Sequence, residues 1–277
     1  MDTLFRNSRR KLSQGLIFWR EVGEGTPVIF LHGAWNDSSQ WISVMESFSQ
    51  DFHCFAPDLL GFGESENPNI LHSIDLQVEC IAEFLQAVKQ EKVYLVGHSL
   101  GGWIAASYAL KYPEQVYGVV LLAPEGVEIA GQEQHCQKMR QLLNYSPLVV
   151  KLLRSLSPLT KILGTHEQIA QDLQLRQHLL RYPIACQLLY KREQAEIEVE
   201  LLQKRLYMIE APILILQGSE DTPDALAKSQ AYSLLAPKAE LKIIADAGND
   251  LAEAFAGDVA IEIREFIKGN WALGMKS

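Results

Sequence analysis

Short apolar runs alternate with longer amphipathic segments along most of the chain. Six runs have the continuous apolar composition of strands that are buried on both faces: Pro27–Leu31, Phe52–Ala56, Val93–Val96, Val116–Leu122, Pro212–Leu216 and Leu241–Ile244. Four other segments carry one apolar stripe and predict helices: Ser39–Phe48, Ile74–Val88, Gly102–Leu110 and Ala252–Ile267. This alternation predicts an α/β fold with a mostly parallel central sheet and helices on both faces.

One long segment interrupts this alternation. From Gly126 to Glu210 the sequence is rich in Leu and Gln, contains three prolines and shows no strand-like pattern. We interpret residues 126–209 as a helical cap inserted between strands, and residues 1–125 and 210–277 as the core. Ligands of open α/β sheets bind beyond the carboxyl ends of the strands. We therefore expect the cap to lie over that end and to line an apolar pocket.

Composition and charge narrow the class of protein. Hydrophobic residues make up 48 % of the 277 residues and charged residues 21 %, which is ordinary for a globular chain. The net charge of −9 argues against a nucleic-acid partner. The four cysteines are too widely spaced for a metal-type pair and predict reduced thiols. With no apolar stretch of signal-peptide or membrane-span length, we expect a cytoplasmic protein.

A glycine-flanked serine carries the strongest chemical signal. Gly97-X-Ser99-X-Gly101 follows a predicted strand and precedes a predicted helix. In that context the motif is typical of a nucleophile elbow, in which the serine sits on a strained turn at the top of the sheet. Amides at the start of the following helix would face an oxyanion formed there.

At this point the chain resembles the α/β-hydrolase family, in its branch with a helical cap. Four segments carry the resemblance in the family's order and spacing: His32-Gly33, Asp58-Leu-Leu-Gly61-Phe-Gly63, Gly97-His-Ser-Leu-Gly101 and Gly218-Ser-Glu-Asp221. The resemblance covers nearly the whole chain and implies hydrolysis of esters, lipids, thioesters or related acyl compounds without a cofactor or a metal.

The resemblance also assigns roles to residues. Ser99 is the expected nucleophile, and the amides of Leu100 and Ala34, or less favourably Trp35, would form the oxyanion hole. Asp221 would orient a histidine, with Glu125 as an alternative acid. Trp35 and His98 are candidate substrate-binding residues, although strand alternation predicts that His98 points away from the Ser99 site.

Two further residues of the motifs are expected to have structural roles. Asp58 is expected to cap its own loop by bonding local amides. His32 is expected to be a packing residue, as histidines of this motif usually are.

The family's catalytic histidine is missing. The place that it should occupy, in a Gly-His pair after the last strand, is taken by Asn249. The seven histidines are His32, His53, His72, His98, His135, His166 and His178, so none lies in the last 99 residues (277 − 178). An asparagine amide can form hydrogen bonds but cannot accept the serine proton near neutral pH.

Three explanations fit the missing histidine. The protein is a natural pseudohydrolase that binds ligands, or it uses another base, or Asn249 is an engineered change. The other bases considered are Asp246, Asp250, Glu125 and a cap histidine. If Asn249 occupies the histidine position, we expect the Asp221 carboxylate to accept a hydrogen bond from its amide.

The predicted cap contains an unusual basic stretch. From Gln134 to His166 there is no Asp or Glu, but there are five cations: Lys138, Arg140, Lys151, Arg154 and Lys161. Many leucines accompany them. Two interpretations remain, an ordinary amphipathic helix pair with solvated cations, or a surface that meets a lipophilic, anionic substrate or a membrane.

The leading hypothesis is a serine hydrolase that acts on an apolar acyl ester with its catalytic base missing or replaced. The alternative is a catalytically inactive pseudohydrolase that binds a small apolar ligand or a protein partner. The substrate and the oligomeric state do not follow from the sequence.

Overall fold

The computed structural model describes residues 4–155 and 166–274, and the chain divides into two compact units. Residues 1–129 and 198–277 make up the first unit, and residues 130–197 the second. Pro158 and Lys161 of the predicted cap lie outside the described residues. The sequence-based boundaries of the cap, 126–209, differ from those of the second unit, 130–197, by four residues at one end (130 − 126) and twelve at the other (209 − 197).

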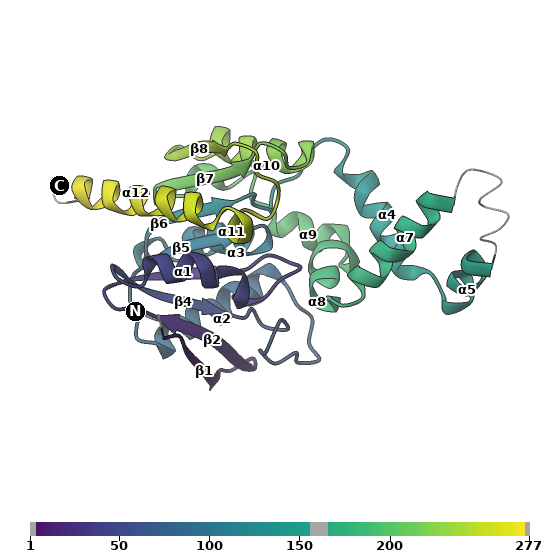
Figure 1. The fold of residues 1–277 in the computed structure, drawn as a ribbon, viewed down its shortest axis with the longest axis horizontal. Coiled ribbons are helices and arrows are strands. Elements are labelled where there is room, and N and C mark those ends of the chain that lie inside the picture. Colours follow the sequence, from purple (N-terminus) through teal and green to yellow (C-terminus); the bar gives the residue numbers. More distant parts are fainter. Residues whose placement is uncertain (1–3, 156–165, 275–277) are drawn as a thin grey trace. The chain divides into compact units, whose positions relative to one another are not determined.

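The first unit is built on an eight-stranded sheet (Figure 1) with the order β1-β2-β4-β3-β5-β6-β7-β8. β1 and β2 form an antiparallel hairpin and β2 pairs antiparallel with β4, whereas every later pairing is parallel. The strands are Arg6–Lys11, Leu16–Val22, Thr26–Leu31, Phe52–Pro57, Val93–His98, Val116–Leu122, Ile213–Gly218 and Ala239–Ile244 for β1 to β8.

Helices cover both faces of this sheet, as the sequence predicts. One hydrophobic core cluster joins one face of the parallel strands to α1, α11 and α12, while α2, α3 and α10 belong to the other face. Their bounds are Ile42–Phe48 for α1, Ile74–Ala87 for α2, Leu100–Lys111 for α3, Pro223–Leu235 for α10, Leu251–Ala254 for α11 and Ala256–Gly274 for α12.

Local sequence signals explain where several helices begin. The Ser73 hydroxyl accepts a hydrogen bond from the Leu76 amide (3.0 Å) and caps α2. Thr222 does the same for α10, where Pro223 occupies the first helical turn. All six strands and all four helices predicted from the sequence are present, and a short 3₁₀ turn, Ser38–Trp41, precedes α1.

All described elements wholly within the second unit are helical: α4 (Gln132–Asn144), α5 (Pro147–Ser155), α7 (His166–Leu179), α8 (Pro183–Cys186) and the π-helical turn Gln187–Lys191. α9 (Gln194–Glu200) spans the boundary with the first unit. The helical prediction for this segment therefore holds over the described residues.

Contacts inside the second unit engage Lys138 and Arg140, two of the five cations of the basic stretch. Lys138 of α4 pairs with Asp172 of α7 at 2.9 Å, and the Arg140 guanidinium donates to the Tyr190 carbonyl oxygen at 2.6 Å. Arg176 of α7 also donates to the carbonyl oxygens of Leu142 and Tyr145. These contacts fasten α4 to α7 and reduce the uncompensated charge of the basic stretch.

Candidate active site

Ser99 occupies a tight turn between a strand and a helix. β5 ends at His98 and α3 begins at Leu100, and Ser99 between them has φ 50° and ψ −112°. A non-glycine residue rarely adopts this conformation, which costs free energy unless the surroundings impose it. Three backbone hydrogen bonds do so: the Ser99 amide donates to Leu122, and its carbonyl oxygen accepts from Trp103 and Glu125. The predicted strained turn is confirmed.

The two glycines of the motif are required by close backbone contacts. A Cβ atom on Gly97 would lie 2.3 Å from the Gly101 carbonyl oxygen, and one on Gly101 would lie 2.2 Å from the Leu31 carbonyl oxygen. Both distances are far inside van der Waals contact and involve backbone atoms. Glycine at these positions therefore lets α3 approach β3 and β5 closely enough to make the turn.

A pocket of about 190 Å³ opens beside Ser99. Most of the predicted site residues line this pocket, whereas Leu100 and Asp221 do not. The lining residues are Gly33, Ala34, Trp35, Asn36, Gln40, His98, Ser99, Asn249, Asp250 and Glu253. The loop Gly33–Asn36 follows β3, and Asn249 follows β8, so the residues come from the carboxyl ends of strands, where ligands of such sheets bind.

His98 does not point away from the Ser99 site, and that expectation was wrong. Both residues line the same pocket. Strand alternation holds only while the chain stays extended, and the left-handed turn at Ser99 ends that alternation. His98 is 5 % exposed, and a Cβ atom on Gly33 would lie 2.7 Å from its Nδ1, so the ring packs directly against the loop after β3.

Hydrogen bonds fix the tautomer of His98. The Gln40 Oε1 atom accepts from the Gly33 amide (3.0 Å), which fixes the orientation of the Gln40 amide and places its NH₂ group 3.0 Å from His98 Nδ1. An amide NH₂ can only donate, so Nδ1 accepts and Nε2 carries the proton. Nε2 then donates to Asn249 Oδ1 at 3.2 Å.

His98 is consequently a neutral donor toward Asn249. Burial lowers the pKa of His98, although its bond to Asn249 and the charges of Glu253 and Asp221 act in the opposite direction. Its one lone pair, on Nδ1, is occupied by Gln40. In this arrangement His98 has no free nitrogen to accept a proton from Ser99.

Gln40 and Glu253, which sequence analysis did not single out, hold the pocket wall. Glu253 accepts from the amides of Gln40 (3.2 Å) and Asn36 (2.9 Å), so one carboxylate anchors both ends of the loop after β3. The only sequence signal for Glu253 was its place four residues after Asn249, about one helical turn.

Asp221 has other partners than Asn249. In the described part of the chain its carboxylate accepts hydrogen bonds from Gln217 Nε2 (3.0 Å) and from the Thr222 amide (2.7 Å) and none from Asn249. Gln217 is fully buried and its Oε1 accepts from the Ser229 hydroxyl, which fixes its amide toward Asp221. The expected Asp221–Asn249 hydrogen bond is thus replaced by a local one.

The other carboxylates considered as acid or base differ in availability. Glu125 forms an ion pair with Lys228 at 2.6 Å and is engaged there. Asp58 accepts from the amides of Ser38 (2.7 Å) and Glu64 (2.6 Å), as expected of a loop-capping residue. Asp250 is exposed and lines the Ser99 pocket, while Asp246 is exposed outside its lining.

His32 has a structural role of the same kind. Its Nε2 accepts from the Leu59 amide at 3.0 Å, and its Nδ1 lies 2.8 Å from the Gly33 carbonyl oxygen, so it ties β3 to the loop after β4. Burial lowers its pKa. Among residues 4–155 and 166–274, no group of three or more His, Cys, Asp or Glu side chains is arranged to hold a metal ion.

The family model of the alpha/beta hydrolase fold matches residues 26–253, which include every element of this pocket. The chain belongs to the α/β-hydrolase fold family. A mouse relative named 1-acylglycerol-3-phosphate O-acyltransferase ABHD5 is 37 % identical over 127 residues, 43 % of this chain and 36 % of that protein. A Pseudomonas putida 2-hydroxy-6-oxo-2,4-heptadienoate hydrolase is 31 % identical over 141 residues, 45 % of this chain and 50 % of that protein. The matched regions thus span half or less of these relatives.

Solved α/β-hydrolase structures match over nearly the full length. An esterase from Thermogutta terrifontis has a TM-score of 0.72 at 21 % identity, covering 96 % of this chain and 99 % of that one. The haloalkane dehalogenase DbeA from Bradyrhizobium elkani has a TM-score of 0.73 at 20 % identity, covering 98 % and 100 %. At this level of identity the likeness establishes the fold. No described helix has both the length and the apolar composition needed to cross a bilayer.

Proposed function

We propose that this α/β-hydrolase is a serine hydrolase of the carboxylic ester type with Ser99 as its nucleophile and with slow turnover. The observation that carries the proposal is the left-handed conformation of Ser99 at the junction of β5 and α3, beside a pocket. Such a turn costs free energy, and strained backbone of this kind occurs mainly at functional sites.

The proposed chemistry uses the backbone around this turn. The Ser99 oxygen attacks the acyl carbon of the ester, and the carbonyl oxygen becomes an oxyanion. The Leu100 amide, at the first position of α3, and the Ala34 amide, in the pocket wall, would donate to it. The oxyanion then collapses and the bond between the acyl carbon and the alkoxide oxygen breaks. The alkoxide takes up a proton from solvent, to which Ser99 has lost its own, and leaves as the alcohol. Water then hydrolyses the acyl-serine, which releases the acid and restores the Ser99 hydroxyl.

Turnover is slow in this proposal because the Ser99 proton has no good acceptor. Asn249 stands where a histidine is expected and cannot accept a proton, and His98 has its lone pair occupied. In subtilisin, removal of the catalytic histidine lowers turnover by about 10⁶, and about 10³–10⁴ over water remains from the oxyanion hole and binding.

We propose an apolar acyl group as the part of the substrate that the protein recognises, with Trp35 and His98 beside the reacting carbon. Both residues line the pocket beside Ser99. We also propose contact of the basic stretch with a membrane surface, and a cytoplasmic location, which is favoured by four cysteines that form no disulfide.

A pseudohydrolase that binds an apolar ligand or a partner is the second candidate. It is favoured by the re-paired side chains of the site: Asn249 accepts from His98, and Asp221 accepts from Gln217 and Thr222. These bonds satisfy the polar groups without any catalytic arrangement.

Labelling with a fluorophosphonate distinguishes the two candidates, since the probe reacts covalently only with an activated serine. The hydrolase proposal predicts slow labelling of the wild-type chain at Ser99, located by peptide mass spectrometry, and none of the Ser99→Ala variant. Absence of labelling over a day, in a folded protein that still binds a fluorescent fatty-acid probe, would favour the pseudohydrolase.

A further inference from the structure

The sheet has two outer edges, and their strands differ in charge pattern. β1 and β8 are its edge strands, and no strand among the described residues pairs with their outer sides. An open edge exposes unpaired N–H and C=O groups to which another chain can add a strand, and many proteins protect such edges with like charges.

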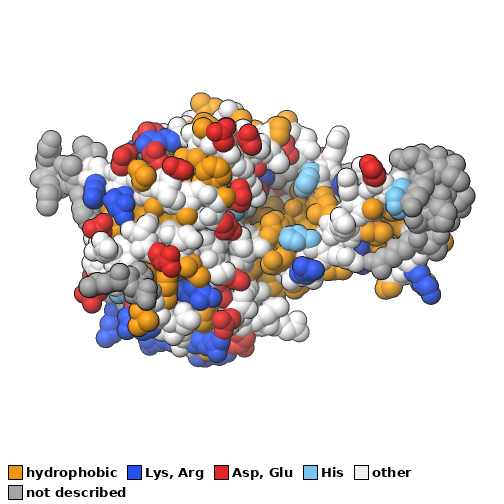
Figure 2. Space-filling view, viewed as in Figure 1, with side chains coloured by type: hydrophobic (Ala, Val, Ile, Leu, Met, Phe, Trp, Pro, Cys, Tyr) orange, Lys and Arg blue, Asp and Glu red, His pale blue; other side chains and the backbone are white. Residues whose placement is uncertain are grey.

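The β1 edge is protected in this way. Four of its six residues are cations: Arg6, Arg9, Arg10 and Lys11. Three of these side chains are more than half exposed, at 70 % for Arg6, 55 % for Arg9 and 64 % for Lys11. In the two antiparallel registers that pair most of the strand with a second β1, Arg6 faces Arg10 or Arg9 faces Arg9. Figure 2 shows basic side chains gathered over the end of the sheet where β1 lies.

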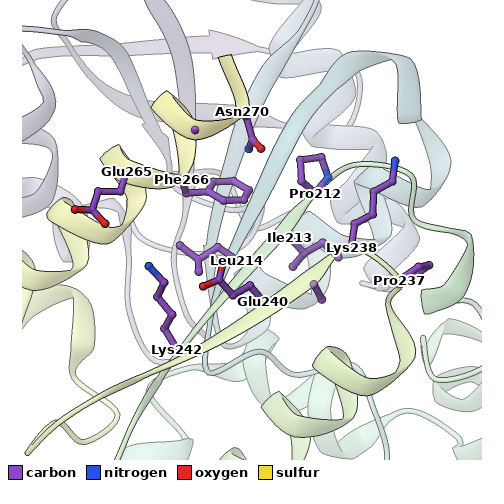
Figure 3. Close-up of a pocket in the computed structure, with 12 residues that line it drawn as sticks. Pro212, Ile213, Leu214, Pro237, Lys238, Glu240, Lys242, Glu265, Phe266 and Asn270 are labelled. Carbon is purple, nitrogen blue, oxygen red and sulfur yellow. The ribbon is translucent and has the colours of Figure 1, made fainter. Parts of the chain in front are cut away.

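The β8 edge carries balanced charges instead. Its sequence, Ala-Glu-Leu-Lys-Ile-Ile, contains one acid, one base and no Pro or Gly. Lys242 pairs with Glu262 of α12 at 2.6 Å, so Glu240 and Lys242 lie on the α12 face. Figure 3 shows both side chains beside Glu265 and Phe266 at a groove of about 490 Å³ between β8 and α12. Leu241 and Ile243 lie on the opposite face, and Ile243 is 50 % exposed.

The outward-facing backbone groups of β8 belong to its odd-numbered residues. The carbonyl oxygens of Lys238 and Ile244 accept from the β7 side, from the amides of Ile213 (2.9 Å) and Ser219 (3.0 Å). Because successive residues of a strand direct their N–H and C=O groups to opposite edges, the groups of Ala239, Leu241 and Ile243 point outward. The Ala239 amide donates to the Ala236 carbonyl oxygen at 3.3 Å, whereas the outward groups of Leu241 and Ile243 and the Ala239 carbonyl oxygen can pair with an added strand.

We propose that two copies of this chain associate by antiparallel pairing of their β8 strands around a two-fold axis at Leu241. Facing residues of an antiparallel pair lie on the same side of the sheet, so only three registers bring the middle of β8 onto itself. An axis at Glu240 places Glu opposite Glu, and an axis at Lys242 places Lys opposite Lys. An axis at Leu241 places each Glu240 opposite the second copy's Lys242, which is the favourable arrangement.

This register also pairs most of the outward backbone groups and brings the apolar side chains together. Leu241 faces its counterpart and exchanges two backbone hydrogen bonds with it. Ile243 faces the second copy's Ala239, and each of these outer pairs gains one bond, from the Ile243 amide to the Ala239 carbonyl oxygen, because the Ala239 amide already donates to Ala236. The Glu240–Lys242 pairs fall on the intervening positions, where Cα atoms of facing residues lie closest, at about 4.5 Å. The result is a continuous sheet across both copies.

Disulfide trapping tests the register. In a Cys136→Ser background, which removes the native cysteine that is not buried, we introduce Leu241→Cys. Facing Cα atoms of a hydrogen-bonded pair are about 5.5 Å apart, within the 4.4–6.8 Å range of disulfides. We expect oxidation to give a covalent dimer. Ile243→Cys is the matched control, since its counterparts lie about four residues apart along the strands and should not cross-link. Cross-linking of Ile243→Cys alone, or of neither variant, would overturn the proposal.

Charge reversal tests the pairing without cross-links. By sedimentation velocity we expect the wild type to dimerise as its concentration rises. Glu240→Lys and Lys242→Glu should each be monomeric, and their equimolar mixture should dimerise, because each supplies the charges that the other needs. Lys204→Glu, an exposed reversal away from the sheet, controls for net charge, and melting curves check that every variant is folded. A wild type that stays monomeric, or a dimer that neither reversal weakens, would contradict the proposal.

Discussion

The two halves of the Ser99 site are built from different kinds of groups. The half that would bind the reacting carbonyl consists of backbone: the left-handed turn at Ser99 and the amides of Ala34 and Leu100. The half that would move protons consists of side chains, and the sequence has Asn249 where we expect a histidine. The first half retains its geometry, whereas Asn249 and Asp221 have each acquired other partners.

This difference shows what fixes each half. Backbone geometry at Ser99 follows from the packing of α3 against β3 and β5, which no single surface side chain controls. Side-chain geometry depends on its hydrogen-bond partners, which here are Gln217 for Asp221 and His98 for Asn249. The geometry of the backbone half therefore does not depend on which side chain occupies position 249.

Substitution of Gly101 should disrupt the backbone half of the site, and we expect it to have the largest effect of the changes considered. The new Cβ atom of Gly101→Ala would lie 2.2 Å from the Leu31 carbonyl oxygen, so α3 must shift away from β3. We expect the free energy of unfolding to fall by about 3 kcal/mol or more, the upper range for overpacking. Urea denaturation measures it. Gly269→Ala is the control, because nothing lies within 4 Å of its Cβ and α12 should be unchanged or slightly stabilised.

A histidine introduced at position 249 tests the side-chain half of the site. We expect Asn249→His to raise turnover of a short p-nitrophenyl ester by at least about tenfold, a small part of the 10²–10⁴ that acid–base catalysis contributes. Asn249→Gln, which brings no base, should give no gain. The Asn249→His/Ser99→Ala double variant should lose the gain.

A folded Asn249→His variant without a gain would mean that re-pairing of Asp221 has disabled the triad. Gln217 Nε2 and the Thr222 amide would then hold Asp221 away from residue 249. The crystal structure of the variant would show whether the new imidazole reaches Ser99 and Asp221.

The sequence predicts the parallel core of the fold because each buried strand is a continuous apolar run. It predicts neither β1, whose residues Arg6–Lys11 are all polar, nor β2 (Leu16–Val22), and β1 exists as a strand through its pairing with β2. α10 was also missed, since its apolar residues form only a weak stripe, although Thr222-Pro223 is a recognisable start signal.

For the site, the sequence predicts the groups that belong to motifs and misses those that support them. The turn at Ser99 follows from Gly97 and Gly101. The roles of Gln40 and Glu253 depend on contacts between residues more than 200 positions apart, which no local pattern encodes. The orientation of His98 could not be predicted by strand alternation because the strand ends there.

Removal of the support from Gln40 should have a smaller effect than restoring the base. In the Asn249→His background, Gln40→Leu leaves the Gly33 amide and His98 Nδ1 without their partner. We expect a several-fold lower kcat with little change in KM, less than the 10²–10³ lost with an oxyanion donor itself, because Gln40 acts only through the loop it positions. An equal loss of kcat with Gln40→Glu, which preserves the acceptor for the Gly33 amide, would show that the His98 contact matters more than the loop.

The smallest expected effect is on how much stability the folded protein loses as the pH falls. This loss tests whether His98 is neutral in the folded state. Burial lowers the pKa of His98 in the folded protein, whereas an unfolded histidine titrates near about 6.5. As the pH falls below that value the unfolded chain takes up a proton that the folded chain does not, so the folded state loses stability. His98→Asn removes this proton uptake and retains a polar side chain that can bond to Gln40. Urea midpoints measured at about pH 7.5 and about pH 5.5, on either side of the ordinary histidine pKa, should therefore fall less in His98→Asn than in the wild type.

Burial lowers the pKa of His32 and His72 as well, but both residues are present in the two proteins, so their contributions cancel in the comparison. Parallel losses in the two proteins would mean that folded His98 accepts a proton as readily as the unfolded chain, and the tautomer assigned from Gln40 would then be wrong.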